Sequence, residues 1–185
     1  MSAEYYESDA RVIWQRPELV MSVLGALEGR TVADIGAGTG YFAFRLAAAG
    51  ANVIAIDIDP RAISFMQSEE QRYSAEVQSR FSTRLANEND PSLANGEVNI
   101  VLMVNTYIYI EDRVAYFERL KEGMQQGGEL VIIDFKKKKT NIGPDVTDRV
   151  ASSDVQRELG LAGYKILEID ESTLDYQYVI KAVKL

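Results

Sequence analysis

Neither cysteine nor histidine occurs in this chain of 185 residues. Without cysteine there is no disulfide, thiolate nucleophile or cysteine-ligated metal site, and the absence is compatible with a reducing compartment. Without histidine the chain lacks the commonest general base near neutral pH and the commonest ligand of transition metals. Acid–base chemistry would therefore fall to Asp, Glu, Tyr or Lys, and we expect no metal site.

Basic residues are also scarce, because 20 Lys and Arg face 28 Asp and Glu and the formal net charge is −8. Nucleic acids and membrane surfaces are themselves negative, so this balance argues against a broad footprint for either, although local basic patches remain possible. No apolar run approaches membrane-spanning length, and the first residues, MSAEYYESDARVIW, lack the features of a signal peptide. We expect a cytoplasmic protein with a small-molecule substrate and with no nucleic-acid or membrane partner.

Hydrophobic residues make up 46% of the chain and charged residues 26%, which is typical of a packed globular protein. The length favours one hydrophobic core over two, so we expect residues 1–185 to form a single domain. The sequence does not indicate the oligomeric state.

Short β-rich runs alternate with helical patterns along the chain. Strands are expected at 31–35, 52–58, around 77–85, at 98–104, 129–135, 164–169 and 176–185, and helices after Pro17, over 41–50, after Pro60, over 114–124 and over 155–162. This order predicts an α/β, Rossmann-like fold with a seven-stranded, mostly parallel sheet and helices on both faces. The last two strands predict a closing antiparallel hairpin.

A glycine-rich loop follows the first expected strand. Residues 34 to 40 read DIGAGTG, with Gly36, Gly38 and Gly40 in the turn. Such glycines let the backbone approach a ligand closely, and the N–H groups that open the next helix point into the site. The third glycine comes one residue earlier than in the dinucleotide pattern G-x-G-x-x-G, which disfavours a dehydrogenase.

With its flanking residues, VADIGAGTGYF, this loop resembles the first motif of the class I S-adenosylmethionine-dependent methyltransferases, an acid and an apolar residue before G-x-G-x-G. In that family the loop holds the methionine end of the cofactor, with the acid near its ammonium group. The resemblance implies this role for Asp34, Gly36, Ala37, Gly38, Gly40 and Tyr41. Charge agrees, because an ammonium group favours a carboxylate, and the cofactor's own carboxylate accepts backbone N–H donors.

Asp57 ends the second expected strand, where a carboxylate can accept hydrogen bonds from both hydroxyls of a ribose. Together with Ile58 it forms the expected nucleoside side of the site. Enzymes that use NAD also carry an acid there, so Asp57 supports an adenosine ligand without choosing between the two classes. Asn87 and Asp90 follow the third expected strand, where the family contacts the adenine, although both are also ordinary turn residues.

Two further regions extend the resemblance. The segment RVIWQRP, which contains Arg11, Trp14, Gln15, Arg16 and Pro17, resembles one that lies over the cofactor in small methyltransferases related to the quinone and arsenite enzymes. Residues 85–117 resemble their adenine-binding and substrate-side loops. Members of that group often carry histidines after the fourth strand, where this chain has TYIYI, so a histidine base is not available. The arsenite branch relies on cysteines, which excludes that activity.

Candidate substrate-side residues are Asn105, Tyr107 and Tyr109, which follow the fourth expected strand. They share a face if the strand continues, and ligands of open α/β sheets bind at this carboxyl edge. Asn105 is also a candidate cofactor contact. The alternative is that the tyrosines pack under the next helix. Lys136 to Lys139 leave the fifth strand and either attract an acidic substrate or form a solvated loop.

The sequence therefore favours a methyltransferase that binds S-adenosylmethionine and transfers a methyl group by in-line displacement, for which the protein mainly aligns donor and acceptor. A non-catalytic protein that binds S-adenosylmethionine or another nucleotide remains an alternative, because the family's histidines are missing. An NAD-dependent oxidoreductase is a second alternative, disfavoured by the glycine spacing and by the terminal strand pair.

Overall fold

The computed structural model describes residues 14–185. Its helices are α3 (Pro17–Leu24), α4 (Ala43–Ala48), α5 (Pro60–Glu70), α6 (Ala75–Ser79), a 3-10 turn (Tyr107–Tyr109), α7 (Arg113–Gly123) and α8 (Ser152–Leu161). Its strands are β1 (Thr31–Ile35), β2 (Asn52–Asp57), β3 (Phe81–Leu85), β4 (Val98–Val104), β5 (Met124–Phe135), β6 (Tyr164–Asp170) and β7 (Gln177–Lys184). Prolines occupy the first turns of α3 and α5, where a missing N–H costs nothing.

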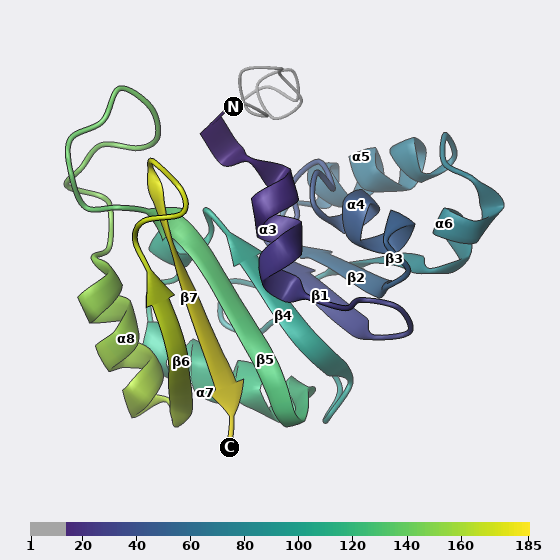
Figure 1. Cartoon of the computed structure of the whole chain (residues 1–185). Helices are drawn as coiled ribbons and strands as arrows, with labels where there is room; N and C mark the ends of the chain where they lie inside the picture. Colours follow the sequence, from purple (N-terminus) through teal and green to yellow (C-terminus); the bar gives the residue numbers. More distant parts are fainter. Residues whose placement is uncertain (1–13) are drawn as a thin grey trace.

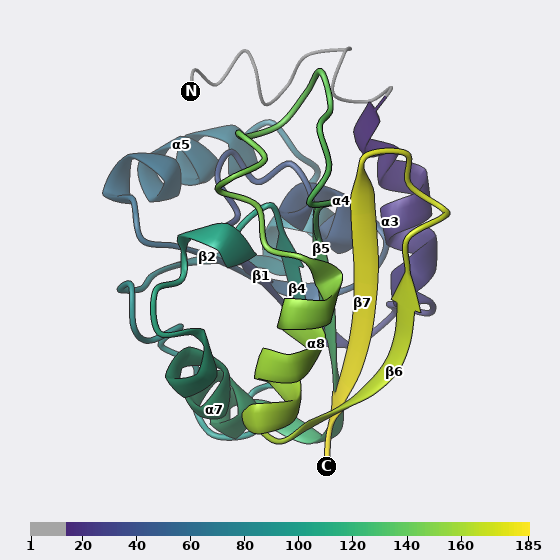
Figure 2. The same cartoon turned by 90° about the vertical axis from the view of Figure 1, so that its left-hand side faces the viewer.

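Within the described residues, seven strands form one sheet in the order β3-β2-β1-β4-β5-β7-β6 (Figure 1). The first five pair in parallel, whereas β7 lies between β5 and β6 and is antiparallel to both. The Rossmann-like fold and the closing antiparallel hairpin are thus confirmed. Because five strands run the same way, the loops after β1, β2, β4 and β5 meet at one edge of the sheet, the upper edge in Figures 1 and 2.

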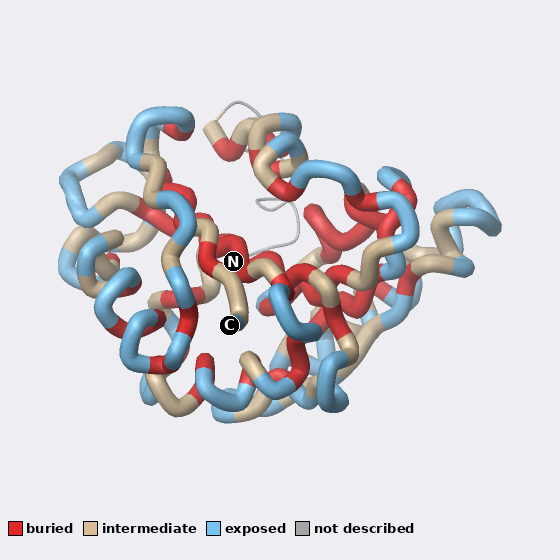
Figure 3. Tube along the Cα trace, turned by 60° about the horizontal axis from the view of Figure 1, so that its bottom comes forward, coloured by how far each residue is buried: buried red, intermediate tan, exposed pale blue. Residues whose placement is uncertain are grey.

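Both faces of the sheet are covered, which explains why the parallel strands are near-continuous apolar runs. One core joins the sheet to α3, α4 and α5, and a second core joins it to α7 and α8. The buried stretches of the chain run through the sheet and the inner sides of the helices, while exposed residues gather on the outer turns and loops (Figure 3). No helix of residues 14–185 has the length and apolar character that a membrane crossing requires.

Two expected boundaries were wrong. Val77 lies in α6 rather than in the third strand, because Ser74 caps a short helix by accepting a hydrogen bond from the Val77 N–H. The helix expected over 114–124 ends at Gly123, and β5 begins at once with Met124. The register against β4 shifts between Val98 and Ile100, so the residues near Gly127 form an irregularity in a strand instead of ending a helix.

Candidate functional site

The loop between β1 and α4 needs its glycines for two different reasons. Gly36, Gly38 and Gly40 have φ angles of 74°, 59° and 81°, in the left-handed region that favours glycine. A Cβ at Gly36 would lie 2.2 Å from Thr106 Oγ1, and one at Gly40 would lie 2.6 Å from the Phe44 ring. At Gly38 no such neighbour lies within 4 Å. The loop is therefore packed at both ends and open in the middle.

Asp57 meets this open part of the loop from the end of β2. Its Oδ2 accepts a hydrogen bond of 2.8 Å from the Gly38 N–H, and its Oδ1 accepts one of 2.9 Å from the Asp59 N–H. Each oxygen retains further acceptor capacity, since a carboxylate has about four lone-pair sites. Asp34 lies one strand over at the end of β1 and is 3% exposed. The two acids thus lie beside the glycine loop, as the sequence predicts, with a partly exposed carboxylate at Asp57.

A hollow of about 330 Å³ lies next to Asp57, lined by Ile58 and by residues 86–89 after β3. The Ile58 side chain is 52% exposed, so an apolar surface faces this space. Asn87 Oδ1 accepts a hydrogen bond from the Asn89 N–H, and Asp90 Oδ1 accepts one from the Ser92 N–H. Asn87 lines the hollow, whereas the Asp90 side chain stabilises the turn in which it lies.

Asn105 follows β4 in a left-handed conformation, with φ 56°. Its side chain belongs to a closed ring of three carboxamides, in which Asn105 donates to Gln15 (3.2 Å), Gln15 to Gln177 (2.7 Å) and Gln177 to Asn105 (2.5 Å). Gln15 and Gln177 are fully buried. The ring fixes residue 15 and the start of β7 to the end of β4.

The segment before α3 contributes a second contact to this edge. The ring of Trp14 lies 5.4 Å from the ring of Phe135, the last residue of β5. Arg16 pairs with Glu18 at 3.5 Å on the surface, and Pro17 is buried. Arg11 lies outside the described residues. Residues 14 and 15 therefore contact the carboxyl edge, where the resemblance puts the cofactor.

The tyrosines after β4 do not share a face, because the strand ends at Val104 and a 3-10 turn follows. Tyr107 is fully buried, stacks on Phe117 and donates a hydrogen bond of 2.6 Å to Glu158 Oε2. Burial and the Glu158 carboxylate raise the pKa of its hydroxyl far above the usual range. Tyr107 therefore packs under α7, as in the alternative reading, and does not face a substrate. Tyr109 is 67% exposed.

Two buried polar groups at the same edge escaped the sequence analysis. Asp134 and Tyr178 face each other in the β5–β7 register, and both are almost completely buried. Asp134 Oδ1 accepts from the Phe135 N–H, while Asp134 Oδ2 and the Tyr178 hydroxyl have no partner of good hydrogen-bond geometry among the described residues. Burial raises the pKa of Asp134 to about 6, although backbone N–H groups nearby favour its charged form. In sequence they look like ordinary strand residues.

The four lysines after β5 differ in their surroundings. Lys136 Nζ donates hydrogen bonds to the carbonyls of Leu174 (2.6 Å) and Asp175 (3.2 Å). Lys137, Lys138 and Lys139 are exposed. Lys137 and Lys138 line a second hollow, which adjoins Tyr178.

A family model for the methyltransferase domain matches residues 27–175, which include the glycine loop, Asp57 and Asn105. The chain belongs to the methyltransferase domain family. This confirms the resemblance to methyltransferases, whereas the closer link to the quinone and arsenite enzymes stays a prediction. Within residues 14–185 this methyltransferase domain has no cluster of three acidic side chains arranged for a metal ion.

Over 119 residues the methyltransferase domain is 31% identical to the tRNA U34 carboxymethyltransferase of Alcanivorax borkumensis. The aligned stretch covers 64% of this chain and 35% of that protein. The chain thus spans about a third of the length of this relative. Among solved structures, a SAM-dependent methyltransferase from Aquifex aeolicus matches with a TM-score of 0.88 and 22% identity, covering 98% of this chain and 96% of that one. The magnesium protoporphyrin IX methyltransferase of Synechocystis PCC 6803 with bound SAM matches with a TM-score of 0.73 and 22% identity, covering 100% and 86%.

Proposed function

We propose that this methyltransferase domain transfers the methyl group of S-adenosylmethionine to a small acceptor molecule. The observation that carries the proposal is the contact of the glycine loop with Asp57, where Gly38 donates to the carboxylate and leaves the space beside its own Cα open. Gly38 has the positive φ of 59° that favours glycine, and because no neighbour crowds its Cα, a ligand can approach the backbone closely at this point. A ligand that lies against the Gly38 backbone and presents hydroxyl groups to the Asp57 carboxylate would fit both the open space and the acid.

The residues around this contact suit an adenosine with an amino-acid tail. Asp57 retains lone pairs for ribose hydroxyls, and the exposed Ile58 offers an apolar surface to a base. Asn87 lies in the same hollow, within the region that would take the adenine. By family resemblance, Asp34 and the loop from Gly36 to Tyr41 would take the methionine end.

When bound, S-adenosylmethionine supplies a methyl group already activated by the sulfonium charge. The protein's part is then to hold the donor, align the acceptor and exclude water. The loop and Asp57 would hold the donor. The carboxamide ring of Gln15, Asn105 and Gln177 links the residue that follows β4 to the first residue of β7. An acceptor that loses a proton would pass it to water or to a carboxylate, since no histidine is present.

Calorimetric titration with S-adenosylmethionine, S-adenosylhomocysteine and NAD tests the cofactor. We expect the first two to bind and NAD to give no heat above dilution. Binding of NAD alone would overturn the proposal in favour of the oxidoreductase alternative. A second assay, which follows formation of S-adenosylhomocysteine with a panel of small acceptors, separates an enzyme from a protein that only binds the cofactor.

The same assay decides between small acceptors and RNA. The relative from Alcanivorax borkumensis is named for tRNA, but the net charge of −8 works against RNA binding because phosphate contacts depend on Lys and Arg. We therefore expect turnover with small acceptors and none with unfractionated tRNA. Turnover with tRNA alone would contradict the small-molecule part of the proposal.

A further inference from the structure

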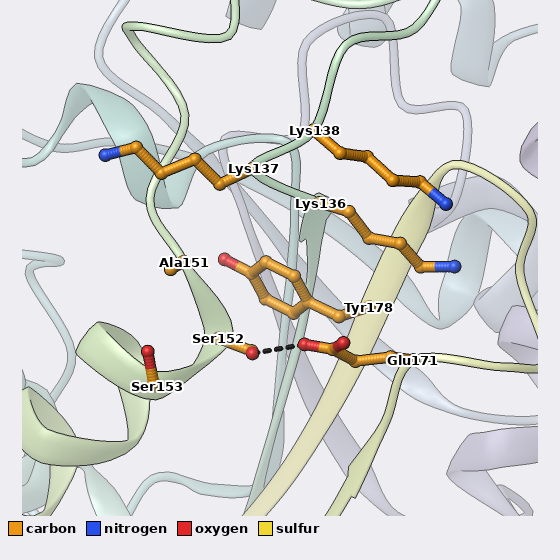
Figure 4. A pocket seen from close by; sticks show the side chains of 8 residues that line it. All are labelled: Lys136, Lys137, Lys138, Ala151, Ser152, Ser153, Glu171 and Tyr178. Carbon is orange, nitrogen blue, oxygen red and sulfur yellow. Dashed lines mark hydrogen bonds between the residues drawn. The ribbon is translucent and has the colours of Figure 1, made fainter.

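A second hollow, of about 350 Å³, lies at the carboxyl end of β5 (Figure 4). Its lining includes Lys137 and Lys138 after the strand, Ser152 and Ser153 at the start of α8, Glu171 after β6, and Tyr178 of β7. It is separate from the hollow beside Ile58 but opens at the same edge of the sheet. The register partner of Tyr178 is Asp134. Gln177, which precedes Tyr178 in β7, donates a hydrogen bond to Asn105.

Tyr178 presents an unused hydrogen-bond donor to this hollow. The side chain is fully buried, its hydroxyl has no hydrogen-bond partner among residues 14–185, and Figure 4 shows the hydroxyl pointing into the hollow toward Ala151. Leaving such a group unpaired costs free energy that a ligand oxygen would recover. Burial raises the pKa of Tyr178 well above its ordinary value, so the hydroxyl stays protonated and acts as a donor.

The start of α8 supplies further donors. The helix has ten residues, and the side chain of Ala151, which precedes it, provides no cap. The N–H groups of Ser152 and Ser153 lie in the first turn, where a helix makes no internal use of them and its dipole favours an anion. Ser152 Oγ already donates a hydrogen bond to the Glu171 carboxylate. A carboxylate of the chain itself is thus bound at this helix end.

The charges around the hollow are mostly positive. Lys137 and Lys138 line the hollow, and their ammonium groups extend to opposite sides, away from the Tyr178 hydroxyl (Figure 4). The Lys136 ammonium donates to the Leu174 carbonyl. Glu171 is the carboxylate among the lining residues, and Asp134, the register partner of Tyr178 on β5, has a pKa raised by burial to about 6. In a chain of net charge −8, donors and lysines gathered in one hollow favour an anionic ligand.

We propose that this hollow binds the carboxylate or phosphate group of the methyl acceptor. The Tyr178 hydroxyl and the backbone N–H groups of Ser152 and Ser153 donate to its oxygens, and Lys137 and Lys138 attract it. That the ligand is the acceptor rests on the proposed function, whereas the binding of an anion here does not. The site thereby narrows the acceptor to molecules that carry an acidic group.

Titration of ¹⁵N-labelled protein with inorganic phosphate, and separately with benzoate, tests the site at constant ionic strength. We expect saturable amide shifts centred on Ser152 and Ser153, and the tighter of the two probes identifies the acidic group. Tyr178→Phe should weaken binding about fivefold or more, the equivalent of one hydrogen bond. This variant removes a hydroxyl without a partner, so it should fold as the wild type does. Tyr176→Phe is the matched control and should bind normally.

Glu171→Gln provides the opposite result, because removing the resident negative charge should tighten binding of either probe. Shifts spread over the whole surface, or equal affinity in the wild type and Tyr178→Phe, would overturn the proposal. Calorimetry with S-adenosylmethionine keeps the two proposals apart, since Tyr178→Phe should bind this cofactor as the wild type does. Failure of the wild type to bind it would sink the proposed function and leave the anion titration to be judged separately.

Discussion

Asp57 combines a structural contact with the predicted binding role. It accepts hydrogen bonds from Gly38 and Asp59, so the same carboxylate that would bind a ribose also fixes the loop that would bind the methionine end. Asp134 is the contrasting acid, because it is buried and has one oxygen without a partner of good geometry among the described residues. Asp57 is therefore available to a ligand, whereas the burial of Asp134 costs free energy of folding when its carboxyl group is charged.

Replacing Asp57 with Asn keeps the shape of the side chain and removes its charge. We expect affinity for S-adenosylmethionine to fall by about 1–3 kcal/mol, the value of a hydrogen-bonded charged group. Calorimetry measures the effect. Asp112→Asn is the matched control, since it makes the same charge change and Asn caps α7 as well as Asp does. Unchanged affinity in Asp57→Asn would count against the ribose role.

Asp134 makes the stability of the fold depend on pH in a definite direction. Its pKa rises from 3.8 to about 6 on folding because burial disfavours the charged form. The folded state therefore holds the proton more tightly, and the stability that this provides is complete below pH 4 and is lost as the pH rises through 6. Compared with Asp134→Asn, the wild type should lose about 2–3 kcal/mol of unfolding free energy between these limits. Urea unfolding of both proteins at several pH values measures the difference in their free energies of unfolding. A difference that stays constant between about pH 4 and 6 would contradict the raised pKa of Asp134.

The connection from β5 to α8, residues 136–151, is a long loop held by one buried side chain. Arg149 is 2% exposed and donates five hydrogen bonds to the backbone carbonyls of Lys136, Lys138, Ile142 and Pro144. Its guanidinium also lies 5.1 Å from the center of the Phe135 ring, which Trp14 contacts. A planar fork of donors suits this task, because several carbonyls converge on it.

Arg149→Lys retains the charge but replaces the fork with a single ammonium, which cannot reach all of these carbonyls. We expect the free energy of unfolding to fall by about 2 kcal/mol or more, since several part-buried hydrogen bonds to backbone carbonyls are lost. Hydrogen–deuterium exchange should rise over residues 136–149. Arg157→Lys on the exposed side of α8 is the control and should leave both quantities unchanged. Equal exchange in Arg149→Lys would show that the loop does not depend on the guanidinium.

The order of the strands brings distant parts of the chain to one edge. Residue 15 lies 162 positions from Gln177 and 90 from Asn105, yet the three carboxamides form a closed ring. Since β7 inserts between β5 and β6, its first residue ends up next to the residue that follows β4. The ring therefore couples the N-terminal part of the described chain to its last strand across the candidate site.

A double-mutant cycle measures this coupling. Gln177→Leu leaves buried partners unsatisfied, and Asn105→Gly tolerates the positive φ of this position. We expect the double variant to be more stable than the sum of the single effects predicts, by about 0.5–3 kcal/mol. Urea unfolding of the four proteins gives the value. Gln177→Leu combined with Gln67→Leu, a change in α5 whose side chain bonds Thr83 and no member of the ring, is the control and should be additive. Additivity in the ring itself would contradict the coupling.

The sequence alone determined the fold class, the seven strands and the pairing of the glycine loop with Asp57, because these depend on local periodicity and on residues at fixed short spacing. It also predicted that Asp34 and Asn105 would lie at the same edge as that loop. Tertiary structure decided the rest. Tyr107 and Tyr109 part because β4 stops at Val104, and Asp134 and Tyr178 become unusual only when β7 pairs with β5. Burial and hydrogen-bond satisfaction arise from packing between segments far apart in the chain, and no spacing along the sequence encodes them.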